Sequence, residues 1–165
     1  MVKKLKYYVK EIILFIVIIT IFANALSLYK SHGLNNADLS LADIYLTNNE
    51  NYSLKNDRPT LVHIWAIWCP TCKVEASNIQ TLSKSYEVLT IAVKSGSNSD
   101  INNWLKANGY DYNVVNDQTG FISANFKVAV FPTTLIYDKN KKLVFSDVGY
   151  TSTWGLFLRM WWASL

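Results

Sequence analysis

The only two cysteines of this 165-residue chain are Cys69 and Cys72, in the stretch "HIWAIWCPTC". Such a pair suits a structural disulfide, a metal clip or a thiol–disulfide exchange centre. A disulfide that closes so short a loop removes little entropy from the unfolded chain, which argues against a purely structural role. A closed zinc site needs four ligands, and copper(I) favours thiolates and thioethers. The only histidines and methionines that could complete such a site are His32, His63, Met1 and Met160. The sequence therefore favours redox exchange, with copper binding by the same thiols as an alternative.

The elements predicted around the cysteines would make one of them reactive. Residues 58–67 form a β-branched and aromatic run typical of a buried central strand, and a helix is expected directly after it. Cys69 would then lie at the helix N-terminus, where free N–H groups and the helix dipole favour the thiolate. We expect the pKa of Cys69 to fall below the free value of ~8.5. Cys72, one turn inside the helix, could then attack the mixed disulfide that Cys69 forms.

The remaining pattern predicts an α/β sandwich. The helix after the cysteines is expected to bury Val74, Ile79, Leu82 and Tyr86. A second helix is expected to begin at a Ser99 cap and to end at Gly109. Ser152 or Thr153 would cap a terminal helix. Strands are predicted in "LADIYL", "NYSL", residues 88–93, "YNVVND" and the two halves of "TTLIYDKNKKLVFSDVGY", with a short helix in "GFISANFKV".

"WAIWCPTCKVE" followed at a distance by "VFPTTLIYD" resembles the thioredoxin superfamily, in its membrane-anchored, exported TlpA/ResA-like branch. The resemblance implies a three-layer thioredoxin-like sandwich with a mixed central sheet and an N-terminal strand pair. It also implies an inserted strand–helix unit, which residues 94–116 would form. The end of the chain, "VGYTSTWGLFLRMWW", is similar to proteins called suppressor of copper sensitivity D, which are protein disulfide oxidoreductases.

The resemblance assigns a substrate-binding loop to the stretch "FPTT". In the family the proline flanked by threonine, here Pro132 beside Thr133, is cis and lies against the active disulfide. The backbone of Phe131 would pair with an extended client chain, as in strand addition. The alternative is an ordinary trans proline in a loop.

Further site residues carry two interpretations each. His63 occupies the strand position where thioredoxins carry a buried acid that is thought to relay the proton of the second cysteine. It could take over this relay, or it is a neutral core histidine hydrogen-bonded to backbone. Glu75 matches a glutamate that tunes the ResA-like site, or it is a solvated residue that suits the helix dipole. Trp68 either shields the disulfide and contacts substrate or only packs. Pro70 and Thr71 would tune the reduction potential, which in thioredoxin-like proteins runs from about −270 to about −120 mV.

The N-terminus predicts export. Residues 1–10 form a basic tail, residues 11–29 an apolar signal-anchor and residues 30–40 a polar linker before the domain at 41–165. "ANA" at 23–25 allows a cleaved signal peptide instead. Outside the five lysines and one glutamate that flank the apolar run, eleven basic residues balance eleven acidic ones, which argues against nucleic-acid binding.

These features predict a single-pass inner-membrane protein whose periplasmic domain exchanges electrons with protein disulfides or thiols. The resemblance to the TlpA-like branch implies that it acts as a reductant. A membrane donor or acceptor would exchange electrons with it. The dithiol carries two electrons, so no cofactor or metal is expected. A disulfide-forming oxidase is an alternative, and we expect a monomer.

Overall fold

The computed structural model describes residues 8–15, 17–19, 21–22, 44–55 and 57–165, and the first three of these ranges are helical. The predicted anchor at 11–29 therefore lies partly outside the described residues, and the predicted linker at 30–40 lies wholly outside them. Within the described part of the chain, no helix combines the length and the apolar character that crossing a membrane requires.

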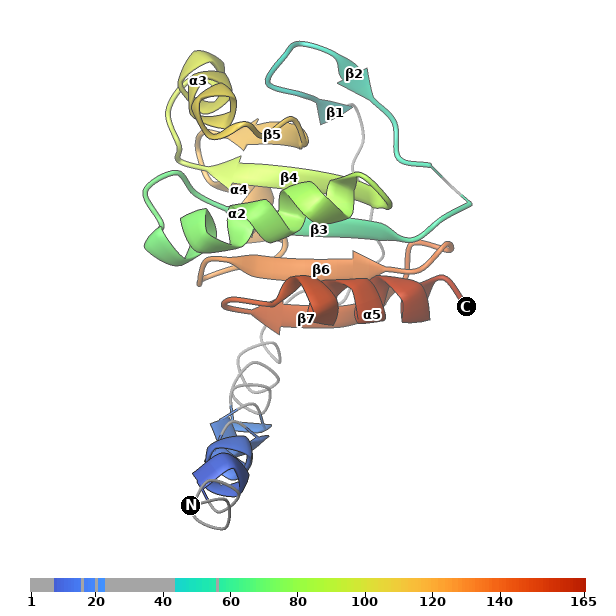
Figure 1. Ribbon diagram of the computed structural model, residues 1–165. Helices are drawn as coiled ribbons and strands as arrows, with labels where there is room; N and C mark the ends of the chain where they lie inside the picture. Colours follow the sequence, from blue (N-terminus) through green and yellow to red (C-terminus); the bar gives the residue numbers. More distant parts are fainter. Residues whose placement is uncertain (1–7, 16, 20, 23–43, 56) are drawn as a thin grey trace.

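One mixed sheet of five strands forms the centre of the domain (Figure 1). Its strands are β3 (Thr60–Trp65), β4 (Glu87–Val93), β5 (Asn113–Asp117), β6 (Thr133–Tyr137) and β7 (Leu143–Val148). Their order is β5-β4-β3-β6-β7, with β3, β4 and β5 mutually parallel and with β6 antiparallel to both of its neighbours. The run at 58–67 thus supplies the central strand as predicted, and every residue of β3 is buried. Burial on both faces explains why that run is apolar without alternation.

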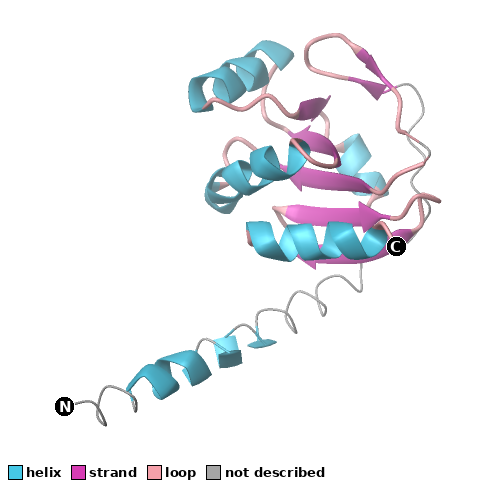
Figure 2. Cartoon of the chain, turned by 45° about the vertical axis from the view of Figure 1, so that its right-hand side comes forward, coloured by secondary structure: helices cyan, strands magenta, loops and turns pink. Residues whose placement is uncertain are grey.

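Helices cover both faces of the sheet, which confirms the three-layer α/β prediction (Figure 2). The helices α2 (Pro70–Ser83), α3 (Asn98–Asn108) and α5 (Thr153–Ala163) share one core with Leu61 and Trp65 of β3. On the other face, α4 (Phe121–Asn125) and the N-terminal strands pack with Val62 and Ile64. The alternation of side chains along β3 therefore serves two cores at once.

The predicted N-terminal strand pair is present but short. Strands β1 (Ile44–Tyr45) and β2 (Asn51–Tyr52) pair antiparallel around a turn in which Asn49 has a φ of 68°. The Thr47 N–H donates to the Val114 carbonyl at 2.8 Å and so ties this turn to β5. The segment predicted as an insertion, 94–116, contains α3 and most of β5.

Three local predictions are wrong. Tyr86 lies beyond the end of α2 and is only half-buried against the core. Ser97, not Ser99, caps α3, because Ser97 and Asp100 form a reciprocal capping box in which each side chain bonds the other's backbone N–H. Val74 is 66% exposed, since it lies about 140° around the helix from Ile79. The buried face of α2 instead follows Cys72, Glu75, Ala76, Asn78, Ile79 and Leu82.

Candidate active site

Cys69 caps the helix that its own sequence context predicts. Its backbone is extended, with φ −85° and ψ 114°, and Pro70 starts the helix at a position where no N–H is needed. The Cys69 Sγ accepts a hydrogen bond from the Cys72 N–H at 3.2 Å. A thiolate on Cys69 would keep this donor and would lie at the positive end of the helix dipole. The arrangement favours a nucleophilic Cys69 after reduction.

The two cysteines form a disulfide with a Cα–Cα separation of 5.3 Å. Both sulfur-bearing residues are buried, Cys72 more deeply at 1% exposure than Cys69 at 5%. Cys69 is therefore the less deeply buried residue of the pair. Within the described residues, no three histidine, cysteine, aspartate or glutamate side chains gather as a metal site.

The Phe131–Pro132 peptide bond is cis, as the resemblance implies. The register that pairs Ile64 of β3 with Thr133 of β6 brings this loop to the sheet edge where β3 ends and α2 begins. The Pro132 carbonyl accepts from the Gly149 N–H at 2.8 Å, and the Thr133 hydroxyl donates to the Val130 carbonyl at 2.7 Å. These bonds hold the loop in place beside the cysteine motif.

Two aromatic rings join the cysteine loop to the proline loop. Trp68 packs edge-on against Phe131 with 5.7 Å between ring centroids, and its indole N–H donates to the Lys94 carbonyl at 3.2 Å. Trp68 remains 57% exposed despite these contacts. Pro70 and Thr71 are also exposed, so the surface around Cys69 is accessible to solvent.

Glu75 is fully buried, so the interpretation as a solvated helix residue is wrong. It follows Cys72 by three residues and therefore lies on the same side of α2. Its Oε1 accepts the Thr151 N–H at 3.2 Å, whereas its Oε2 has no hydrogen-bond partner. Burial raises the pKa of Glu75 to about 8; the charge of Asp147 adds to the rise, and the Thr151 bond opposes it. This carboxyl can hold a proton at neutral pH.

His63 is a buried, neutral imidazole. Its Nδ1 is hydrogen-bonded to the Thr134 hydroxyl at 2.9 Å, not to backbone. Burial lowers its pKa to about 3, because the charged imidazolium would lose its hydration. An imidazole with this pKa takes up a proton only well below neutrality, which favours the core interpretation over the proton relay.

The sheet register places a row of polar residues beneath these groups, of which the sequence analysis singled out only His63. Thr90, His63, Thr134 and Asp147 stand side by side across β4, β3, β6 and β7. Arg159 of α5 binds Asp147 through two contacts, Nη2–Oδ1 at 3.0 Å and Nε–Oδ2 at 2.9 Å. The single acid within the strand "LVFSDV" is the only local signal of this pair.

The fold and the Cys69–Cys72 pair define a thioredoxin-fold thiol–disulfide oxidoreductase, in which the disulfide itself is the redox group. The chain belongs to the AhpC/TSA family, whose model matches residues 34–146.

Named relatives agree with this class. The chain is 32% identical over 126 residues to a thioredoxin-like protein of Haemophilus influenzae, covering 76% of this chain and 75% of the relative. It is 30% identical to the thiol:disulfide interchange protein DsbE of Escherichia coli, covering 58% of this chain and 52% of DsbE. Its fold matches the exposed lipoprotein thioredoxin Etrx1 of Streptococcus pneumoniae with a TM-score of 0.62 and 25% identity, covering 75% of this chain and 98% of Etrx1.

Proposed function

We propose that this chain reduces the disulfides of exported proteins on the periplasmic side of a bacterial inner membrane, to which its N-terminal segment anchors it. One observation carries the chemistry: Cys69 caps α2, and its Sγ accepts the Cys72 N–H. The likeness to DsbE, a thiol:disulfide interchange protein, supports a protein disulfide as the substrate.

The exchange takes two steps. The Cys69 thiolate attacks one sulfur of the client disulfide, forming a mixed disulfide and releasing the client's other sulfur as a thiolate. Cys72 then loses its proton and attacks Cys69, which forms the Cys69–Cys72 disulfide and releases the second client thiolate. The enzyme dithiol loses two electrons and the client disulfide gains them. No other redox group enters these steps.

Glu75 is proposed as the group that governs the proton of Cys72. It lies one turn along α2 from Cys72, and its Oε2 has no hydrogen-bond partner. With a pKa of about 8, its carboxylate form can accept a proton from a thiol whose ordinary pKa is ~8.5. His63 does not suit this task as well, because its pKa is about 3.

The client chain is proposed to lie along the loop before β6. The backbone of Phe131 would pair with it in strand fashion, and Thr133 fixes that loop through its bond to Val130. The exposed side of Trp68 and the exposed residues Pro70 and Thr71 would contact the client around Cys69.

Trapping tests the exchange. A Cys72→Ala variant lacks the resolving sulfur, so mixed disulfides with client proteins should accumulate on Cys69 in intact cells. Thr81→Ala, an exposed change farther along α2, is the matched control and should accumulate none. Absence of mixed disulfides in the Cys72→Ala cells, together with tight copper(I) binding by the native pair, would favour the copper-binding alternative.

The direction of electron flow needs a separate measurement. Alkylation of free thiols with a mass tag in intact cells reports the resting state of the Cys69–Cys72 pair. A reductant that a membrane donor continually re-reduces should have its cysteine pair mostly in the dithiol form. A mostly oxidised pair would instead identify a disulfide-forming oxidase.

The anchor is proposed from the N-terminal apolar run. The described side chains between Ile12 and Phe22 are about half exposed or more, which suits a lipid environment better than water. The lysines before this run would remain cytoplasmic. The intact mass of the membrane-extracted protein distinguishes the full chain from one cleaved after "ANA". The finer resemblance to suppressor of copper sensitivity D and the monomeric state remain predictions.

A further inference from the structure

The outer face of α5 carries large apolar side chains. These are Trp154 at 81% exposure, Leu158 at 63%, Trp161 at 55% and Trp162 at 62%, together with Leu165 at 78% just beyond the helix end. At 100° per residue they fall within an arc of about 100°, and we call them the α5 stripe. The opposite side of the helix packs Leu156, Met160 and Ala163 into the core. The stripe is therefore a second apolar face that the described part of the chain leaves uncovered.

No charge interrupts the α5 stripe. The only charged residue of α5 is Arg159, and it is paired with the buried Asp147. Three exposed tryptophans on one short helix form a patch of the kind that marks an interaction surface rather than ordinary solvent contact. Tryptophan is also the residue enriched where protein meets the membrane–water interface, because its ring is apolar and its N–H is polar.

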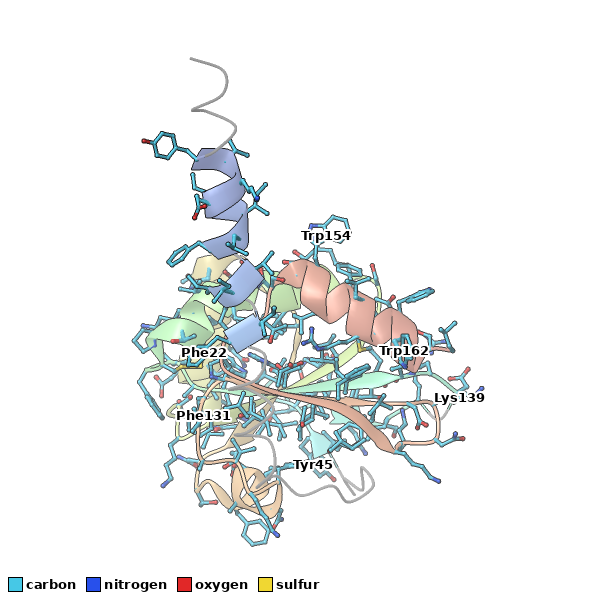
Figure 3. All side chains as sticks on the ribbon, turned by 90° about the horizontal axis from the view of Figure 1, so that it is seen from below. Phe22, Tyr45, Phe131, Lys139, Trp154 and Trp162 are labelled. Atoms are coloured by element: carbon cyan, nitrogen blue, oxygen red, sulfur yellow. A yellow bond between two sulfur atoms is a disulfide. The ribbon has the colours of Figure 1, made fainter. Side chains whose placement is uncertain are left out.

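The topology sets the stripe beside the active site and not over it. Strands β3 and β7 both run antiparallel to β6, so they end at the same sheet edge, and α2 and α5 both begin there. Trp154 lies at this end of α5, and Trp162 lies near the other end (Figure 3). A surface in contact with the whole stripe would therefore lie next to the helix that begins at Cys69.

Basic residues flank the far end of the stripe. The turn between β6 and β7 carries the exposed Lys139 and Lys142, at the sheet edge toward which α5 runs. Figure 3 shows Lys139 and Trp162 on the same side of the molecule. The one acidic residue of this turn, Asp138, accepts hydrogen bonds through its Oδ1 from the backbone N–H groups of Asn140 and Lys142. An apolar stripe that ends beside lysines matches the pattern of an interfacial helix at an anionic lipid surface.

We infer that the α5 stripe docks onto the anionic lipid surface of the membrane that holds the N-terminal segment. This inference rests on the anchoring proposed above. The undescribed residues 23–43 span at most about 75 Å when fully extended, so an anchored domain stays near the bilayer. Tethering raises the effective concentration of the surface, so even a weak helix–lipid contact is populated.

Fluorescence quenching in vesicles tests the inference on the full chain. The protein is reconstituted into vesicles of phosphatidylcholine and phosphatidylglycerol whose acyl chains are brominated, in a Trp68→Phe background that leaves only stripe tryptophans highly exposed. We expect strong quenching of tryptophan emission. A Leu158→Glu/Leu165→Glu variant retains all three stripe tryptophans and should lose most of this quenching. Phe121→Glu, an equally exposed apolar position on the opposite face of the sheet, should retain it.

Vesicle flotation separates the two proposals. If the chain does not float with vesicles, the anchor fails. If it floats and its tryptophans are not quenched by brominated lipid, the anchor stands and docking of the α5 stripe is overturned. The tryptophans could instead become protected from quenching by aqueous iodide as the amount of protein per vesicle rises, without being quenched by lipid. This outcome would assign the stripe to a contact between copies of the chain and would also overturn docking onto lipid.

Discussion

The indole of Trp68 and the ring of Phe131 meet at 83°, with 5.7 Å between their centroids. This edge-to-face contact links the residue before Cys69 to the residue before the cis Pro132. The two motifs are far apart in sequence, and the pairing of β3 with β6 brings them to one sheet edge. The aromatic contact therefore fixes the spacing between the nucleophile and the proposed client-binding loop.

Removing both rings should cost less than the sum of the single losses. Trp68→Ala and Phe131→Ala should show a coupling of about 0.5–1.5 kcal/mol in the unfolding free energy of the oxidised protein. Urea unfolding of the four members of the cycle measures it. Trp68→Ala combined with Trp162→Ala, which lies toward the other end of the domain, should be additive. Additivity in the Trp68/Phe131 cycle would show that the ring contact contributes no energy.

Glu75 should make the protein less stable as the pH rises. Its folded pKa of about 8 lies above the ordinary 4.5, so the folded state holds the proton more tightly than the unfolded state. The resulting stabilisation is complete below pH 4.5 and is lost as the pH rises toward 8. Glu75→Gln mimics the protonated carboxyl. Its unfolding free energy relative to that of the wild type should rise across this pH window by an amount on the order of a few kcal/mol.

Unfolding at pH 5, 7 and 9 in the oxidised state measures this gain. The exposed Glu50→Gln change is the matched control and should follow the wild-type curve. Parallel curves for wild type and Glu75→Gln would mean that Glu75 is ionised in the folded state.

His63 should act in the opposite direction at acid pH. Its folded pKa of about 3 lies below 6.5, so the unfolded state takes up a proton first. Stability contributed by the neutral ring is therefore lost as the pH falls from 6.5 toward 3. His63→Asn retains a polar partner for Thr134 and should remove this part of the acid sensitivity, whereas His32→Asn in the predicted linker should not. Urea unfolding between pH 6.5 and 3 measures this effect. If the unfolding free energy of His63→Asn depends on pH as steeply as that of the wild type, His63 is not a neutral imidazole of lowered pKa in the folded protein.

The sequence predicts those parts of the site that contiguous stretches of residues determine. The apolar run before Cys69, the helix after it and the motif at Pro132 are all contiguous signals, and the structure bears them out. The burial of Glu75 is not local, because it depends on Thr151 and Asp147 arriving from the far end of the chain. The exposure of Val74 follows from the same cause, since the burial of Cys72 and Glu75 fixes which side of α2 faces the sheet.

Removing only one partner of the Asp147–Arg159 pair should destabilise the fold more than removing both charges. The two side chains are only 11% and 23% exposed, so Arg159→Met would leave a largely buried carboxylate without its partner. We expect a loss of about 2 kcal/mol in unfolding free energy, and a smaller loss for Asp147→Asn/Arg159→Met, which removes both charges.

Because the Asp147 charge raises the pKa of Glu75, Asp147→Asn alone should shift the pH window of the Glu75 effect downward. Urea unfolding across pH measures both effects. Equal losses in the Arg159→Met and double variants, with an unmoved pH window in Asp147→Asn, would show that the pair acts independently of the Glu75 carboxyl.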